Sequence, residues 1–102
     1  MSYEKAARIT ELSPGKGKLV ELKGKKIALF NIDGKFYAID DVCKHAGASL
    51  SQGQVEGKVV RCPKHGAEFD IFNGKALTSP ASEDVRCYKV QVMGEDVLVE
   101  VF

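Results

Sequence analysis

An all-β fold of antiparallel strands is what this sequence predicts, and three observations support that prediction. Short runs rich in β-branched and aromatic residues alternate with glycine-containing turns along the whole chain. No convincing helical stretch interrupts them. Asp33-Gly34 and Asn73-Gly74 are two-residue sequences that favour type I′ hairpins, the tight connection between antiparallel neighbours. We therefore expect a β-sandwich or barrel of about seven to nine short strands.

Turn residues bound each expected strand, and Phe30, Ile32, Phe36 and Ala38 follow a spacing of two that suits one buried face. Pro80 excludes the segment around it from a central strand. Segments 42–53 and 62–66 do not fit as strands. The expected strands are 6–12, 18–22, 26–32, 35–40, 58–61, 67–72, 75–77, 85–92 and 97–102.

Length and composition narrow the class of protein. A chain of 102 residues suits one domain, 1–102. With 15 Lys plus Arg against 14 Asp plus Glu, the overall charge favours neither nucleic acid nor a membrane surface as partner. The longest apolar run, 27–30, is far short of the ~20 residues that span a bilayer. Three cysteines are too few for a disulfide framework, so we expect a cytoplasmic protein.

The two segments that are not strands hold both histidines and two of the three cysteines of the chain. Two thiolates and two imidazoles make a metal site by ligand count. A structural zinc site stays open as an alternative, although zinc usually takes both thiolates of a pair from one segment, whereas each segment here offers one Cys and one His. A cysteine nucleophile would leave the second Cys and His unexplained. A redox dithiol would more naturally show Cys-x-x-Cys. The sequence reads Cys43-Lys44-His45, then sixteen intervening residues, then Cys62-Pro63-Lys64-His65.

This spacing resembles the Rieske family, in which two histidines replace two cysteines on one iron of a 2Fe-2S cluster. The resemblance implies that Cys43 and Cys62 bind the inner iron, and that His45 and His65 bind the outer iron. It also implies that segment 42–66, together with a proline-containing covering loop at 79–81, forms a cluster-binding tip on a base of β-strands. Glycines at 47, 53 and 66 would let the backbone approach the cluster closely.

Departures from one branch of the family narrow the expected role. Rieske proteins of cytochrome bc complexes have a disulfide between the loops, and a Ser and a Tyr that donate hydrogen bonds to sulfur. Ala48 and Lys64 stand at the disulfide positions here, and Ala67 and Phe69 at the hydroxyl positions. The chain therefore resembles the low-potential ferredoxins of ring-hydroxylating oxygenases, with a midpoint expected at about −150 to −50 mV.

The resemblance implies an electron carrier rather than an enzyme. Its expected donor is a flavoprotein or ferredoxin reductase, and its acceptor a terminal oxygenase or another reductase. The alternative is a small Rieske-like subunit of an assimilatory nitrite reductase. A structural zinc-binding module is a less favoured alternative.

Two further features concern Cys87 and the local charge. Cys87 matches no ligand position, and we expect an ordinary thiol on the face of segment 85–92 opposite Tyr88, Val90 and Val92. Basic residues outnumber acidic ones in segment 42–66, which predicts either steering of an acidic partner or simple compensation for iron-bound thiolates. These residues are Lys44, Lys58, Arg61 and Lys64, against Glu56 alone.

Overall fold

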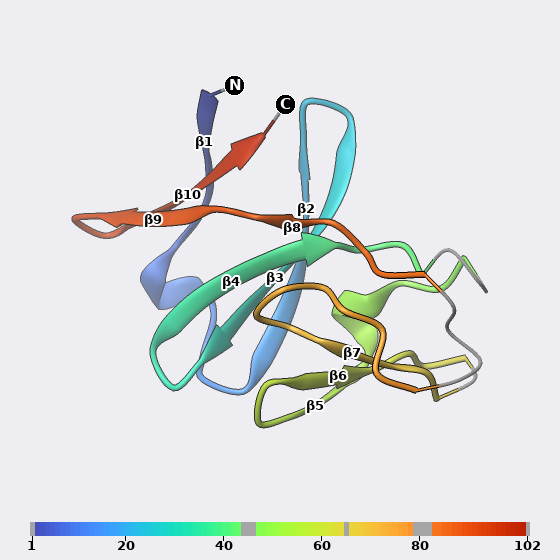
Figure 1. Cartoon of the computed structure of the whole chain (residues 1–102). Coiled ribbons are helices and arrows are strands. Elements are labelled where there is room, and N and C mark those ends of the chain that lie inside the picture. Colours follow the sequence, from blue (N-terminus) through green and yellow to red (C-terminus); the bar gives the residue numbers. More distant parts are fainter. Residues whose placement is uncertain (1, 44–46, 65, 79–82, 102) are drawn as a thin grey trace.

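The computed structural model describes residues 2–43, 47–64, 66–78 and 83–101, and within them every sheet is antiparallel (Figure 1). No helix among these residues is long and apolar enough to cross a membrane. Two short 3-10 turns, η1 (Ile9–Glu11) and η2 (Leu50–Gln52), accompany the strands. The strands are β1 (Ser2–Arg8), β2 (Lys16–Leu22), β3 (Lys25–Ile32), β4 (Lys35–Asp40), β5 (Gln54–Glu56), β6 (Val59–Arg61), β7 (Glu68–Asp70), β8 (Cys87–Tyr88), β9 (Val90–Met93) and β10 (Asp96–Val101).

The strands form three sheets, with strand orders β1-β10-β9, β2-β3-β4-β8 and β5-β6-β7. The first two make the base of the molecule. In the third, smaller sheet, β5 and β6 lie between Cys43 and Cys62 in the sequence, and β7 follows Cys62. This arrangement confirms the predicted all-β antiparallel class.

Strand β3 lies at the centre because both of its faces are buried. Ile27 and Leu29 pack in one hydrophobic cluster with residues of β1 and β10, while Ala28, Phe30 and Ile32 pack in a second cluster with residues of β6 and β7. A strand covered on both sides reads as a continuous apolar run, which explains the sequence from Ile27 to Phe30. The second cluster includes both Cys43 and Cys62, so the core continues directly into the predicted site.

The hairpin predicted at Asp33-Gly34 is confirmed. Both residues have positive φ, +54° and +89°, as a type I′ turn requires. The turn connects β3 to β4 in the register that pairs Ile32 with Lys35. This hairpin forms the middle of the central sheet and ends at Asp40, three residues before Cys43.

Several strand boundaries differ from those expected. The first strand is Ser2–Arg8 rather than 6–12, because the chain turns at η1, where the Arg8 N–H donates to Glu11 Oε1 at 2.7 Å. Strand β5 was not predicted. Segment 75–77 makes only an isolated bridge to β7 among the described residues, between Ala76 and Phe69. The pairing does not continue, because the Glu68 N–H donates to the Thr78 hydroxyl rather than to a backbone carbonyl.

The predicted strand 85–92 is two strands in two different sheets. β8 pairs with β4, and β9 pairs with β10, with Lys89 between them. Tyr88 is buried and Cys87 exposed, as expected, but Val92 is 48% exposed because β9 lies at an edge of its sheet. Val92, expected on the same face as Tyr88, is therefore not buried with it.

Candidate metal centre

Cys43 begins a loop closed by two backbone hydrogen bonds. Its N–H donates to the Ala48 carbonyl at 2.9 Å, and its own carbonyl accepts from the Gly47 N–H at 2.6 Å. Gly47 has φ +68°, a left-handed conformation that other residues adopt with strain. The thiol is thereby placed at the start of a compact turn.

Cys62 begins a second loop with the same hydrogen-bond frame. Its N–H donates to the Ala67 carbonyl at 2.7 Å, its carbonyl accepts from the Gly66 N–H at 3.0 Å, and Gly66 has φ +76°. Each loop therefore reads Cys-x-x-x-Gly-Ala, and the matched glycines close both turns. The described residues of the two loops therefore share one pattern of backbone hydrogen bonds, and the loops follow β4 and β6 in the chain (Figure 1).

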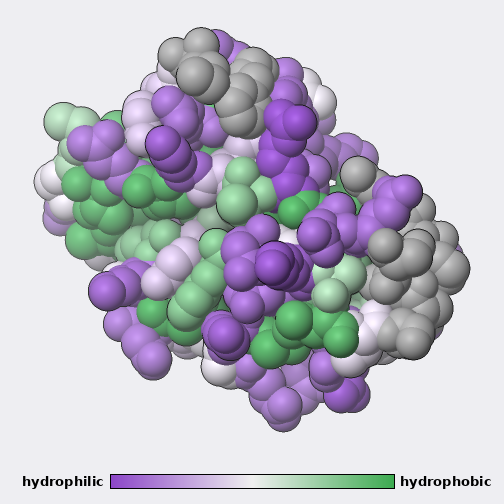
Figure 2. Space-filling model, in the orientation of Figure 1, coloured by the Kyte–Doolittle hydropathy of each residue, from purple (hydrophilic) through white to green (hydrophobic). Residues whose placement is uncertain are grey.

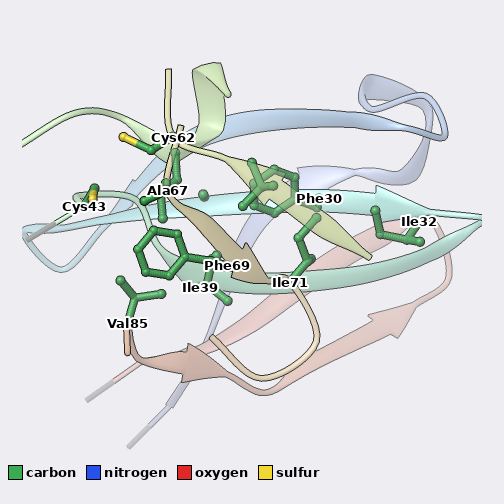
Figure 3. Packing of buried hydrophobic residues seen from close by; sticks show 12 residues of the cluster. Phe30, Ile32, Ile39, Cys43, Cys62, Ala67, Phe69, Ile71 and Val85 are labelled. Atoms are coloured by element: carbon green, nitrogen blue, oxygen red, sulfur yellow. The ribbon is translucent and has the colours of Figure 1, made fainter. Parts of the chain in front are cut away.

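The two cysteine side chains lie at the same end of the hydrophobic core (Figure 3). Cys43 is 0% exposed and Cys62 is 1% exposed, and neither forms a disulfide. Cys87, in contrast, is exposed on β8. The structure thus brings together the two thiols that the sequence selected and leaves the third one apart.

His45, His65 and the loop at 79–81 lie outside the described residues, so their place in the site stays a prediction. Among the residues that are described, no group of three His, Cys, Asp or Glu side chains forms a metal site.

The two loops approach each other through Gly53, which follows η2. A Cβ at Gly53 would lie 2.2 Å from the Arg61 carbonyl oxygen and 3.0 Å from Val60 Cγ2. Arg61 is the residue before Cys62. Only a glycine lets the return from the first loop pass this close to the start of the second. We predicted a close approach to the cluster at position 53, and the contact found here is with the neighbouring backbone.

Asp40, the last residue of β4, connects this strand to β8 through two hydrogen bonds. The Tyr88 hydroxyl donates to Asp40 Oδ1, and the Arg86 N–H donates to Asp40 Oδ2 at 3.3 Å. Burial, together with this hydrogen bond to a carboxylate, raises the pKa of the Tyr88 phenol well above its usual value. The phenol therefore stays a neutral hydrogen-bond donor at physiological pH.

The local charge is smaller than the sequence count predicted. Lys58 pairs with Asp70 at 3.5 Å, and Arg61 pairs with Glu68 at 3.0 Å. Both acids come from β7, beyond the segment that was counted. Lys64 is exposed, and Lys44 lies outside the described residues. The excess positive charge expected from segment 42–66 is therefore reduced in the structure, because two acidic residues of β7 pair with two of its basic residues.

Comparison with known proteins places these loops in a family. Residues 2–89 match the model of the Rieske [2Fe-2S] domain. The biphenyl dioxygenase ferredoxin subunit of Pseudomonas sp. (strain KKS102) is 38% identical over 101 residues, covering 98% of this chain and 93% of that protein.

Solved structures agree with this match. The ferredoxin of carbazole 1,9a-dioxygenase from Nocardioides aromaticivorans IC177 superposes with a TM-score of 0.92 at 29% identity, covering 97% of each chain. A ferredoxin in a complex of reduced oxygenase and oxidized ferredoxin in carbazole 1,9a-dioxygenase gives a TM-score of 0.90 at 32% identity, covering 95% of this chain and 91% of that one. A putative NADH-dependent nitrite reductase small subunit from Mycobacterium tuberculosis gives 0.87 at 27% identity, covering 99% and 96%.

Fold and paired loops together define an iron–sulfur protein. The chain belongs to the Rieske [2Fe-2S] domain family. Its cofactor is the family's 2Fe-2S cluster, which is favoured over structural zinc. The residues fit this cofactor, because two buried thiols on matched loops meet at one end of the core.

Proposed function

We propose that this protein carries single electrons from a flavoprotein or ferredoxin reductase to a terminal oxygenase. The observation that supports this most is the pair of matched Cys-x-x-x-Gly-Ala loops, each with its thiol buried, in a chain of the Rieske family. When bound, the cluster supplies a one-electron redox couple. The protein's part is to hold that group at the end of a rigid β-core and to expose it to partners.

Cys43 and Cys62 are proposed as ligands of the inner iron, and His45 and His65 as ligands of the outer one. Burial of both thiols against the core suits the inner position. The histidines follow their cysteines by two and three residues in the sequence. Segment 42–66 would then be the cluster-binding part of a single domain, with 79–81 as its covering loop.

A low reduction potential follows from the side chains around the two thiols. Ala67 is 0% exposed and Phe69 is 1% exposed, and both belong to the buried cluster that includes Cys43 and Cys62; in Figure 3 Ala67 lies beside the cysteines and Phe69 lies next to Ala67. Neither has a hydroxyl that could donate a hydrogen bond to sulfur. Such donors stabilise the charge added on reduction, so their absence favours the oxidised state.

On the face shown in Figure 2, hydrophilic residues surround smaller hydrophobic areas that a partner could contact. Near the two loops, Val42 is 40% exposed and Leu77 is 46% exposed. Lys64 belongs to the second loop and is exposed. Unlike Lys58 and Arg61, it forms no ion pair with another described residue. We infer that an acidic patch of the acceptor is attracted there and then packs on the apolar residues.

A second acceptor class has one observation in its favour, the likeness to a putative nitrite reductase small subunit over 99% of the chain. The two proposed roles differ in the protein that accepts the electron, a terminal oxygenase or a nitrite reductase. Reconstitution with an oxygenase and with a nitrite reductase large subunit separates them, since only the physiological acceptor is reduced at a catalytic rate.

Ligand variants test the electron-carrier proposal. Cys43→Ser, Cys62→Ser, His45→Ala and His65→Ala should each lose most of the iron and acid-labile sulfide, because each removes one of four protein ligands. Cys87→Ser is the matched control, a conservative change at an exposed thiol, and should keep the full cluster. Full cluster content in any of the four ligand variants, or loss of it in the control, would show that the ligand assignment is wrong.

A further inference from the structure

The first cluster loop is fastened to the central sheet by one buried acid, Asp41, which is 2% exposed. Its Oδ2 accepts from the Ser49 hydroxyl at 2.7 Å, and its Oδ1 accepts from the Ser51 N–H at 2.8 Å. Its backbone carbonyl also accepts from the Leu50 N–H at 2.6 Å, and its N–H donates to the Lys26 carbonyl on β3 at 3.0 Å. Asp41 therefore ties residues 49–51, the return of the loop, to the sheet from which the loop departs.

The described residues of the second loop are held to the sheet in a different way. The residue two positions before Cys62 is Val60, which is 0% exposed and apolar, and the return of that loop continues directly into β7. The β6–β7 ladder holds it through the pairing of Arg61 with Glu68. In the first loop, Val42 and Ser49 make only an isolated bridge, so the Asp41 side chain replaces the missing ladder.

The partners of the Asp41 carboxylate are neutral. A serine hydroxyl and a backbone N–H hold it, and no Lys, Arg or His in the described part of the chain forms an ion pair with it. A buried negative charge without a counter-charge acts over a longer distance than one at the surface, because the surrounding protein screens it weakly. It lies two residues from Cys43.

We propose that Asp41 is a positioning residue for the cluster, whose buried carboxylate fastens the first loop and whose negative charge lowers the reduction potential. The inference rests on the proposed function, since it needs a cluster at Cys43. A negative charge nearby disfavours the addition of an electron, so the oxidised form is stabilised. The Asp41 carboxylate and the hydroxyl-free surroundings at Ala67 and Phe69 thus act in the same direction.

Three variants separate the charge from the fastening. Asp41→Asn removes the charge while an amide of the same shape still accepts from the Ser51 N–H. Asp41→Glu keeps the charge. Asp70→Asn is the comparison variant: Asp70 is also buried, at 6% exposed, but it lies opposite Val59, three residues before Cys62, and its carboxylate contacts the exposed Lys58 side chain, where solvent screens its charge more strongly.

The measurement is the midpoint potential of each cluster-loaded protein, by spectroelectrochemical titration at one pH. At a fixed potential, Asp41→Asn should raise the ratio of reduced to oxidised protein by about tenfold, equivalent to about 59 mV for a one-electron couple. Asp41→Glu and Asp70→Asn should change it by less than about threefold.

An unshifted Asp41→Asn protein, or an equal shift in either of the other two variants, would overturn the inference. If Asp41→Asn fails to bind the cluster, Asp41→Glu decides. A loaded Asp41→Glu protein with the wild-type midpoint supports the inference, and a changed midpoint or an empty protein overturns it. A wild-type protein without a cluster would contradict the proposed function itself, whereas a loaded wild type with an unshifted Asp41→Asn overturns only the role of Asp41.

Discussion

Replacing Gly53 with alanine should separate the two cluster loops and deplete the cluster. The new Cβ would lie 2.2 Å from the Arg61 carbonyl oxygen and 3.1 Å from the Leu50 carbonyl oxygen. Ordinary contacts are about 3.5 Å, so one of the two backbone segments must move by about 1 Å. Gly53 has φ −76°, which alanine adopts freely, so the entire cost is steric.

Overpacking of this kind costs about 1–3 kcal/mol. For a domain of this size, 1 kcal/mol lowers Tm by about 4–8 °C, so Gly53→Ala should lower it by at least about 4 °C. Thermal unfolding followed by circular dichroism measures that loss. Iron and acid-labile sulfide analysis measures the displacement of the loop that begins at Cys62.

Gly94→Ala is the matched control, in the turn between β9 and β10. Gly94 has φ +63° and nothing within 4 Å of an added Cβ, so alanine there destabilises through backbone strain alone. The control should lose some stability and keep its cluster. A Gly53→Ala protein that unfolds within about 2 °C of wild type and holds the full cluster would refute the steric argument.

Three further predictions follow from individual side chains. Ala67→Ser and Phe69→Tyr should each raise the midpoint potential, since they add a hydroxyl donor beside the thiols, and a fall in potential in protein-film voltammetry would contradict this. In the wild type, the raised pKa of Tyr88 means that the folded state keeps a proton that the unfolded state releases above about pH 10, so stability falls as pH rises. Tyr88→Phe should make this loss of stability less steep. Equal slopes of unfolding free energy against pH in the two proteins would show that Tyr88 does not contribute. Lys64→Glu should slow reduction of the acceptor in stopped-flow experiments, most at low ionic strength. Lys58→Glu should slow it less, because Lys58 lies at the opposite end of β6 from Cys62. Rates unchanged in both variants would place docking on apolar contacts.

Local sequence signals predicted several parts of the fold whose cause is local, but the type I′ turn expected at Asn73-Gly74 was wrong, because Gly74 has a positive φ and Asn73 does not. Asp33-Gly34 specifies its turn through two positive φ values, and the alternation around Phe30 and Ile32 specifies a buried strand face. Cys43 and Cys62 were selected because the ligand count suggests a metal site and the spacing resembles that of the Rieske family, and the structure brings both to one end of the core.

Features that depend on distant partners were missed. Segment 85–92 is a continuous β-like run, yet the chain changes sheets at Lys89 because β4 and β10 offer two different edges. Asp41 is one of two adjacent aspartates in a polar segment, and only the returning chain at Ser49 and Ser51 shows that its side chain is buried. The charge near the loops was overestimated for the same reason, since the acids that pair with Lys58 and Arg61 come from β7.

The most direct test of the central claim is the spectrum and metal content of the protein purified with air excluded. The account predicts a red-brown protein with iron and acid-labile sulfide in equal amounts. After reduction, its average EPR g-value should fall below that of clusters held by four cysteines, because two ligands of one iron are imidazoles. A colourless protein with one zinc bound to Cys43 and Cys62, or a cluster whose g-average matches all-cysteine ligation, would contradict it.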